Sequence, residues 1–164
     1  MRGGIRPRHL LTLLAAMCVG FVGFALVLQH FFNIAPCPLC VLQRYAFLAI
    51  ALFCLIGARF GDRRIATGLA LLSALSGVGL ALWQLLTTST PGVSCGLDPM
   101  ETVVNRLFTA EWLPFLFKAD GMCGDDNGVI LWLTTPQWAL FWFVVLSLVL
   151  VWLALRGEGQ RGAA

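Results

Sequence analysis

Four long apolar stretches limit the fold of this chain more than any other feature of its sequence. Leu10–Leu28, Ile65–Leu86 and Pro136–Leu155 contain no charged residue, and Cys37–Ala58 is interrupted only by Arg44. A helix needs about 20 apolar residues to cross the hydrocarbon core of a bilayer, so each stretch is long enough to span it once. Because the bilayer core offers no water to backbone N–H and C=O groups, each span is predicted to be an α-helix.

The composition favours a membrane protein over a soluble one. Only 12% of the 164 residues are charged and 59% are hydrophobic, whereas about 25% of the residues of a soluble domain are charged. We therefore predict an all-α membrane protein in which residues 1–164 form a single domain, a four-transmembrane-helix bundle. Its spans are expected at residues 10–28, 38–58, 65–86 and 136–155. A cleaved signal peptide is the alternative for the first span, although that stretch is long for one.

The lysines and arginines predict which way the bundle faces. Eight of the 11 lie on one side of the predicted bilayer, and they are Arg2, Arg6, Arg8, Arg59, Arg63, Arg64, Arg156 and Arg161. Basic residues accumulate in cytoplasmic loops, so both termini are expected in the cytoplasm. Residues 29–37 and the long loop 87–135, between the third and fourth spans, are then expected on the outer side. The net charge of +3 follows from this asymmetry and does not indicate nucleic-acid binding.

The long outer loop is predicted to be more than a plain linker. Met100–Phe108 places its apolar residues at helix-like spacing. Trp112–Phe117 is an apolar run that is too short to cross a bilayer. Such segments either lie on the membrane surface or pack on the end of the bundle, and both arrangements would keep the loop near the lipid boundary.

Several residues inside the spans are expected to serve packing. The third span contains small residues that allow close helix contact in membranes, and they are Gly68, Ser73, Ala74, Ser76, Gly77 and Gly79. Cys18 and Cys54 lie within the first and second spans, where a buried cysteine behaves as a small apolar residue. His9 is expected to contact headgroups. His30, near the outer face, could supply a proton to a redox ligand, but an ordinary interfacial histidine is the simpler interpretation.

Four cysteines on the predicted outer side are the candidate catalytic residues. Cys37 and Cys40 form a Cys-x-x-Cys pair at the start of the second span, and Cys95 and Cys123 lie in the long outer loop. Thiols outside the cytoplasm are normally oxidised, and thiolate attack passes a disulfide from one pair to another. At about 3.3 Å per residue, the loop is long enough to bring its cysteines to the first pair. Two pairs beside lipid predict a relay between protein disulfides and an acceptor dissolved in the membrane.

The start of the second span is suited to holding a thiolate. Pro38 favours the first turn of a helix, which places Cys37 near the N-cap and Cys40 in the opening turn. The free N–H groups and the dipole of a helix N-terminus stabilise a sulfur anion. Arg44 follows Cys40 by four residues and so lies on the same face. It is predicted to stabilise a sulfur anion or a ligand oxyanion, and the alternative is an arginine that extends outward as an interfacial anchor.

The outer cysteines leave other interpretations open. Zinc bound by all four would have suitable ligand types, but structural zinc ligands usually come in close pairs and Cys95 is far from Cys123. Static disulfides are common in exported proteins. Against them, the spacing of Cys37 and Cys40 suits rapid opening and closing better than constraint of a long loop. Covalent haem attachment is excluded because Val41, and not histidine, follows the pair.

The motif Cys37-Pro38-Leu39-Cys40-Val41-Leu42-Gln43-Arg44, four spans and a second outer cysteine pair together resemble the DsbB family. Further similar segments are Glu111-Trp112-Leu113-Pro114 and Pro136-Gln137-Trp138. Members are disulfide bond formation proteins of the bacterial inner membrane, with redox cysteines facing the periplasm. The resemblance implies a thiol-disulfide oxidoreductase that re-oxidises a periplasmic DsbA-like thiol oxidase. It also implies a membrane quinone, ubiquinone or menaquinone, as the electron acceptor.

The same resemblance implies a role for each site residue. Cys40 is expected to meet the quinone, with Arg44 close to a quinone oxygen, and Cys37 to exchange with the loop pair. Cys95 is expected to form the mixed disulfide with the DsbA-like partner and Cys123 to be its partner cysteine, with a transient Cys37–Cys123 bridge.

The chain departs from some relatives near the outer end of the third span. They carry a histidine where this chain has Trp83-Gln84-Leu85-Leu86, so no histidine contribution to quinone binding is expected there. Two alternatives to the relay remain. One is a vitamin K epoxide reductase-like enzyme, although that family places its Cys-x-x-Cys late in the chain. The other is a membrane scaffold with static disulfides and no enzymatic activity.

Overall fold

The computed structural model describes residues 7–32, 35–60, 63–89, 99–106, 110, 112–119, 121, 129–130 and 133–159. Within them, four long helices dominate, and they are α1 (Pro7–Phe31), α2 (Pro38–Arg59), α3 (Arg63–Ser89) and α7 (Thr135–Gly159). Each contains a segment long and apolar enough to cross a membrane. The predicted all-α architecture of four transmembrane helices is therefore confirmed.

The helices run past the predicted spans at most of their ends, because hydropathy detects the apolar part of a helix and not its last hydrogen bond. The outer end of α3 is the clearest case, since it continues to Ser89 instead of stopping at Leu86. There the hydroxyls of Thr87 and Thr88 donate to the carbonyl oxygen of Gln84, at 2.9 and 2.7 Å. These threonine hydroxyls bond back to a carbonyl of the preceding turn, as hydroxyl side chains in helices often do.

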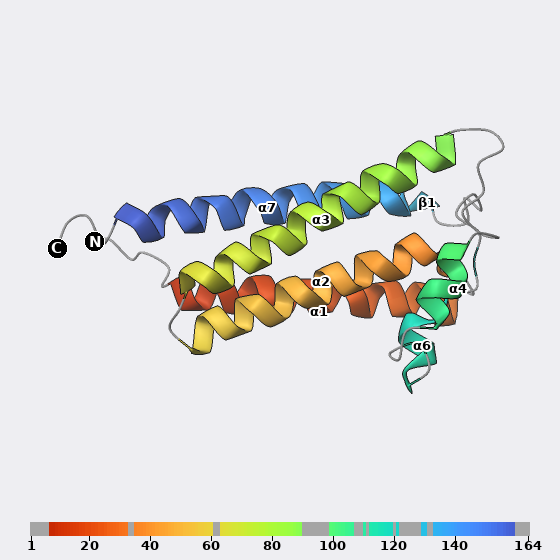
Figure 1. The fold of residues 1–164 in the computed structure, drawn as a ribbon, viewed down its shortest axis with the longest axis horizontal. Helices are drawn as coiled ribbons and strands as arrows, with labels where there is room; N and C mark the ends of the chain where they lie inside the picture. The colour runs from red at the N-terminus through yellow and green to blue at the C-terminus, as the bar shows by residue number, and fades with distance from the viewer. Residues whose placement is uncertain are drawn as a thin grey trace.

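The four helices lie side by side as an antiparallel bundle (Figure 1). Helix α2 packs between α1 and α3, and α3 packs on α7. Helices α1 and α7 also meet, because the rings of Phe21 and Trp142 lie 4.8 Å apart. The start of α1 and the end of α7 lie at one end of the bundle, together with the end of α2 and the start of α3 (Figure 1).

The core forms where α3 presents its smallest side chains. Ala70, Ala74, Gly77 and Ala81 are all buried, and their spacing of three and four residues places them on one face of the helix. A Cβ atom at Gly77 would overlap the ring of Phe143, so only glycine allows this approach of α7. Phe143 is fully buried and stacks on Phe47 at 4.1 Å. Cys18 and Cys54 are also fully buried in this core, as expected of structural cysteines.

The predicted set of small packing residues is therefore only partly right. Ala74 and Gly77 lie at a helix contact, whereas a Cβ at Gly68 or Gly79 would meet no atom within 4 Å. Ser73 and Ser76 bond to carbonyl groups of their own helix, at 2.9 and 2.8 Å. Small size alone does not reveal which side of a helix faces its neighbour.

Shorter elements gather at the other end of the bundle, where α2 begins. They are α4 (Pro99–Asn105), α6 (Pro114–Phe117), β1 (Val129–Ile130) and β2 (Leu133–Thr134). Helices α4 and α6 run roughly across the direction of the long helices (Figure 1). The two strands pair antiparallel, with Val129 opposite Thr134 and Ile130 opposite Leu133, and they lead directly into α7.

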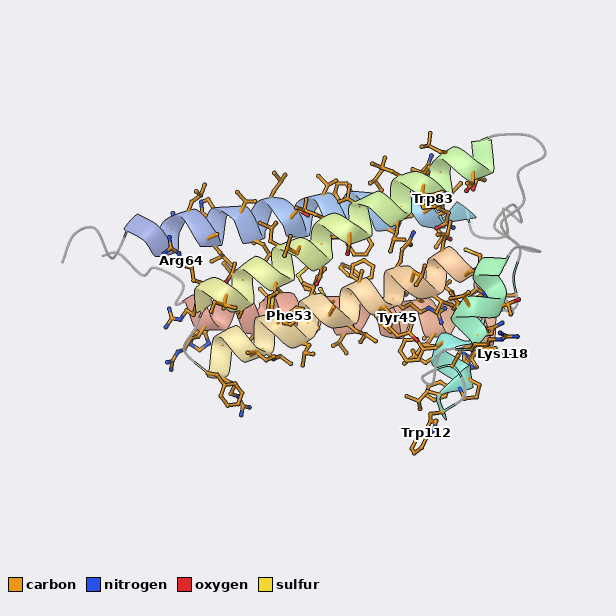
Figure 2. All side chains as sticks on the ribbon, in the orientation of Figure 1. Tyr45, Phe53, Arg64, Trp83, Trp112 and Lys118 are labelled. Atoms are coloured by element: carbon orange, nitrogen blue, oxygen red, sulfur yellow. The ribbon has the colours of Figure 1, made fainter. Side chains whose placement is uncertain are left out.

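The two apolar loop segments pack on the bundle through one face and leave the other exposed. Val104 of α4 and Phe117 of α6 are buried, and the Phe117 ring stacks on Tyr45 of α2 at 4.3 Å. Trp112 lies at the tip farthest from the bundle (Figure 2), and it is 73% exposed. The segment from Trp112 to Phe117 therefore both packs on the bundle, through Phe117, and exposes an apolar side chain, Trp112.

Candidate functional site

Helix α2 begins with a cysteine as its N-cap. Cys37 has extended backbone angles, φ −75° and ψ 163°, and Pro38 occupies the first helical position. The Cys37 sulfur accepts a hydrogen bond from the backbone N–H of Cys40 at 3.2 Å. A serine or aspartate usually fills this place, because its oxygen satisfies an unpaired N–H of the first turn. Here the Cys37 sulfur does so.

Cys37 and Cys40 form a close, unbonded pair. Their Sγ atoms lie 2.7 Å apart and neither cysteine is in a disulfide. A small side-chain movement would bring them to the length of about 2.05 Å that a disulfide requires. Cys37 is 3% exposed, and Cys40 is a partly exposed residue. The pair can therefore open and close without moving the backbone.

The two sulfurs differ in how they hold a proton. Cys37 donates its S–H to the sulfur of Cys40, and this hydrogen bond, together with burial, raises the pKa of the Cys37 thiol. The proton of the reduced pair is therefore held on Cys37. Cys40 is the less buried residue of the pair.

A pair of glutamine side chains approaches the sulfurs from inside the bundle. The Nε2 atom of Gln84, on α3, lies 3.4 Å from the Cys37 sulfur and 3.3 Å from the Cys40 sulfur. Its Oε1 atom accepts a hydrogen bond of 2.8 Å from Nε2 of Gln43, on α2. Both glutamines are buried. The sequence interpretation missed them as site residues, although a polar side chain inside a predicted membrane span is a reason to suspect one.

Arg44 lies one turn beyond Cys40 and is 6% exposed. Its Nη1 atom donates to the side-chain oxygen of Gln29 at 2.8 Å and to the backbone oxygen of Leu116 at 2.7 Å. The guanidinium thus connects α1, α2 and α6, and it lies within electrostatic range of both cysteines. The alternative of an anchor that extends into water does not match this burial.

The loop after α6 is held against the entrance of α2. Asn105 at the end of α4 bonds Ala119 twice, because its amide donates to the Ala119 oxygen and its oxygen accepts from the Ala119 N–H, both at 2.9 Å. Two residues later, the N–H of Gly121 donates to the oxygen of Pro36 at 3.1 Å. A Cβ at Gly121 would overlap the carbonyl of Ala35, so the two segments are in close contact.

The predicted loop cysteines, Cys95 and Cys123, lie outside the described residues. Gly121, two residues before Cys123 in the sequence, is the nearest residue that the structure describes. Pro36, to which Gly121 is bonded, immediately precedes Cys37. His30, by contrast, is exposed and its ring nitrogen lies 3.0 Å from the Leu26 carbonyl of its own helix.

A protein-family model described as "Disulfide bond formation protein DsbB" matches residues 7–153 of this chain. The chain belongs to the DsbB family. Curated relatives of the family, each named "Disulfide bond formation protein B", agree over almost the whole length. The protein of Herminiimonas arsenicoxydans is 47% identical over 151 residues, or 91% of this chain and 96% of the relative. That of Ralstonia nicotianae is 43% identical over 152 residues, covering 92% and 96%.

A third DsbB relative, from Burkholderia pseudomallei, is 40% identical over 158 residues and covers 94% of each chain. The match to the family is thus not confined to the Cys-x-x-Cys motif. It includes all four long helices and the outer loop between α3 and α7. Membership of the DsbB family makes the chain a disulfide-forming oxidoreductase, and neither the vitamin K epoxide reductase-like alternative nor the static scaffold is favoured.

Proposed function

We propose that this DsbB-family protein re-oxidises a periplasmic DsbA-like dithiol protein and passes the electrons to a membrane quinone. The observation that carries the proposal is the arrangement of Cys37 and Cys40. Their sulfurs lie 2.7 Å apart at a helix start, unbonded, beside a buried arginine. A purely structural disulfide would not need a neighbouring positive charge.

In the proposed reaction each step exchanges one disulfide for another. A thiolate of the reduced partner attacks Cys95 in a Cys95–Cys123 disulfide, and Cys123 leaves as a thiolate. Cys123 then attacks Cys37 in a Cys37–Cys40 disulfide, so a Cys37–Cys123 bond forms and Cys40 leaves as a thiolate. The bond between Gly121 and Pro36 supports this order, because it holds the chain near Cys123 beside Cys37.

Two further exchanges complete the cycle. The second partner thiolate attacks the mixed disulfide at its own first sulfur, which releases the oxidised partner and Cys95 as a thiolate. Cys95 attacks Cys123, which re-forms Cys95–Cys123 and frees Cys37. The partner has then lost two electrons and two protons, and the Cys37–Cys40 pair has gained them. Loss of one of these protons leaves a thiolate, the form that can pass the electrons on.

The residues at the start of α2 fit a quinone as acceptor. When bound, a quinone accepts the two electrons and two protons of the reduced pair. Cys40 is a partly exposed residue in the first turn of α2. Arg44 offers a buried positive charge and, besides the bonded Nη1, the N–H donors of Nη2 and Nε. These are the groups expected to hold a ring oxygen that becomes negatively charged during reduction.

The proposed site faces the periplasm from the inner membrane. At the opposite end of the bundle lie the start of α1, the end of α2, the start of α3 and the end of α7 (Figure 1), where eight of the 11 basic residues cluster in sequence. Arg64 lies at that end and Trp83 toward the end that carries α4 (Figure 2). By the rule that basic loops stay in the cytoplasm, the cysteine end is the periplasmic one.

A reconstituted reaction tests the proposal. Purified protein in lipid nanodiscs would receive ubiquinone and a reduced DsbA-like protein, and quinone reduction would be followed by absorbance. We expect turnover with the unchanged chain and its loss in Cys37→Ser and in Cys95→Ser. Cys18→Ala, a change of a core cysteine, is the matched control and should retain turnover. Quinone reduction that survives either serine variant would contradict the relay.

A further inference from the structure

Gln84 reaches both sulfurs of the redox pair from a different helix. Its amide nitrogen lies 3.3 Å from the Cys40 sulfur and 3.4 Å from the Cys37 sulfur, within hydrogen-bond range for sulfur. The side chain is 4% exposed, so the amide has given up water for these contacts. The hydroxyls of Thr87 and Thr88 donate to the backbone carbonyl oxygen of Gln84, within the last two turns of α3.

Gln43 determines which end of the Gln84 amide faces the sulfurs. It donates from Nε2 to the Gln84 oxygen at 2.8 Å, and it is itself 5% exposed. An amide has one end that accepts and one that donates. If Gln84 turned over, an oxygen would face two electron-rich sulfurs, and two amide N–H groups would oppose each other. The bond from Gln43 therefore keeps the donor end of Gln84 on the cysteines.

We infer that Gln84 is a positioning residue for the redox pair, and that Gln43 acts through it by orienting its amide. This inference rests on the proposed relay function. A hydrogen-bond donor stabilises a sulfur anion more than an uncharged disulfide sulfur. The amide therefore favours the reduced Cys37–Cys40 pair, and so makes its disulfide a better acceptor of electrons from the outer loop.

The test measures the disulfide equilibrium of Cys37–Cys40 alone. The loop cysteines are replaced in a Cys95→Ser, Cys123→Ser background, and the quinone-free protein is equilibrated with glutathione redox buffers. Mass spectrometry of the Cys37–Cys40 peptide gives the oxidised fraction. For Gln84→Met, which keeps the length but removes the donor, we expect the disulfide to be about tenfold harder to reduce, or ~30 mV more negative.

Gln43→Met should shift the equilibrium in the same direction by less, because Gln84 keeps its donor but loses its orientation. The double variant should match Gln84→Met alone, since Gln43 acts only through Gln84. The rate of Cys40 alkylation by iodoacetamide at neutral pH should fall in the same order, because the thiolate is the reactive form. Ser147→Ala is the control, because Ser147 is also buried but bonds only the Phe143 carbonyl in its own helix.

An unchanged equilibrium in a folded Gln84→Met protein would overturn the inference, as would additive effects of the two glutamine changes. If Gln84→Met does not fold, the Gln43→Met variant is the test. An unchanged Cys37–Cys40 equilibrium in that variant would then contradict the inference. Failure of the proposed function would appear in a different measurement, the reduction of quinone. It would leave the unchanged chain unable to reduce quinone, whereas this equilibrium involves neither quinone nor partner.

Discussion

Arg44 shows how one side chain joins the chemistry to the outer loop. Its Nη1 atom bonds Gln29 of α1 and the Leu116 carbonyl of α6, while its charge lies near both cysteines. A buried guanidinium can hold several acceptors at once because its donors form a rigid, planar fork. Arg44 is therefore expected both to serve the acceptor site and to keep α6 on the bundle.

Replacement of Arg44 by lysine should show whether the guanidinium serves quinone reduction in particular. The ammonium group keeps the charge but cannot reproduce the planar arrangement of donors, so we expect quinone reduction to slow at least tenfold. Exchange of Cys37–Cys40 with glutathione should change much less, because the sulfurs themselves are unaltered. Steady-state kinetics with varied ubiquinone measure the first effect. Arg156→Lys, at the other end of the bundle, is the control, and quinone kinetics unchanged in Arg44→Lys would refute the role.

Gly121 is a second residue with a local, testable function. In Gly121→Ala the new Cβ would overlap the Ala35 carbonyl, so the segment leading to Cys123 must move away from Cys37. We expect a several-fold lower yield of the Cys37–Cys123 bridge, trapped in a Cys40→Ser, Cys95→Ser background and measured by mass spectrometry. Gly68→Ala is the control, because its Cβ would meet no neighbour. Equal yields from both variants would show that this contact does not guide the exchange.

At the scale of the element, α3 links the core to the site. Gln84 follows Gly77 by seven residues, two turns of helix, and so lies on the same face. The close approach of Phe143 to Gly77 sets the distance and rotation of α3 in the bundle. That rotation also presents the Gln84 amide to the cysteines of α2. Packing in the middle of the helix is therefore expected to influence the redox pair at its end.

Gly77→Ala should destabilise the bundle. The added methyl group would force the Phe143 ring or the helix to shift, and overpacking of this kind costs about 1–3 kcal/mol. Thermal unfolding in detergent, followed by circular dichroism, should show a lower midpoint. Gly79→Ala, two residues away with open space at its Cβ, should leave the midpoint unchanged or raise it slightly. A midpoint for Gly77→Ala equal to that of Gly79→Ala would contradict the packing argument.

At the scale of the whole molecule, the bundle separates a basic end from a redox end. The start of α1, the end of α2, the start of α3 and the end of α7 share one end, and α4, α6 and the start of α2 share the other (Figure 1). An orientation that puts the basic end in the cytoplasm places all exchange with soluble thiol proteins in the periplasm.

A topology experiment tests this orientation directly. Alkaline phosphatase fused after Arg64 should be inactive, because the enzyme needs periplasmic disulfides and this fusion point is expected in the cytoplasm. A green fluorescent protein fusion at the same point should fluoresce. The same reporters fused after residue 90 should give the opposite pattern. Phosphatase activity after Arg64 would invert the proposed topology.

The sequence alone determined the four spans and the helix start at Cys37, because each depends on residues close together in the chain, and it indicated the family through motifs spread along the chain. Apolar length decides what can cross a bilayer, and Pro38 decides where α2 begins. Only the tertiary structure decided that Gln84 faces the two sulfurs, that Arg44 bonds α6 and that Gly121 lies against Ala35. These contacts join distant parts of the chain, and they depend on how each helix is rotated and how closely it packs, which a periodic pattern of apolar residues leaves open.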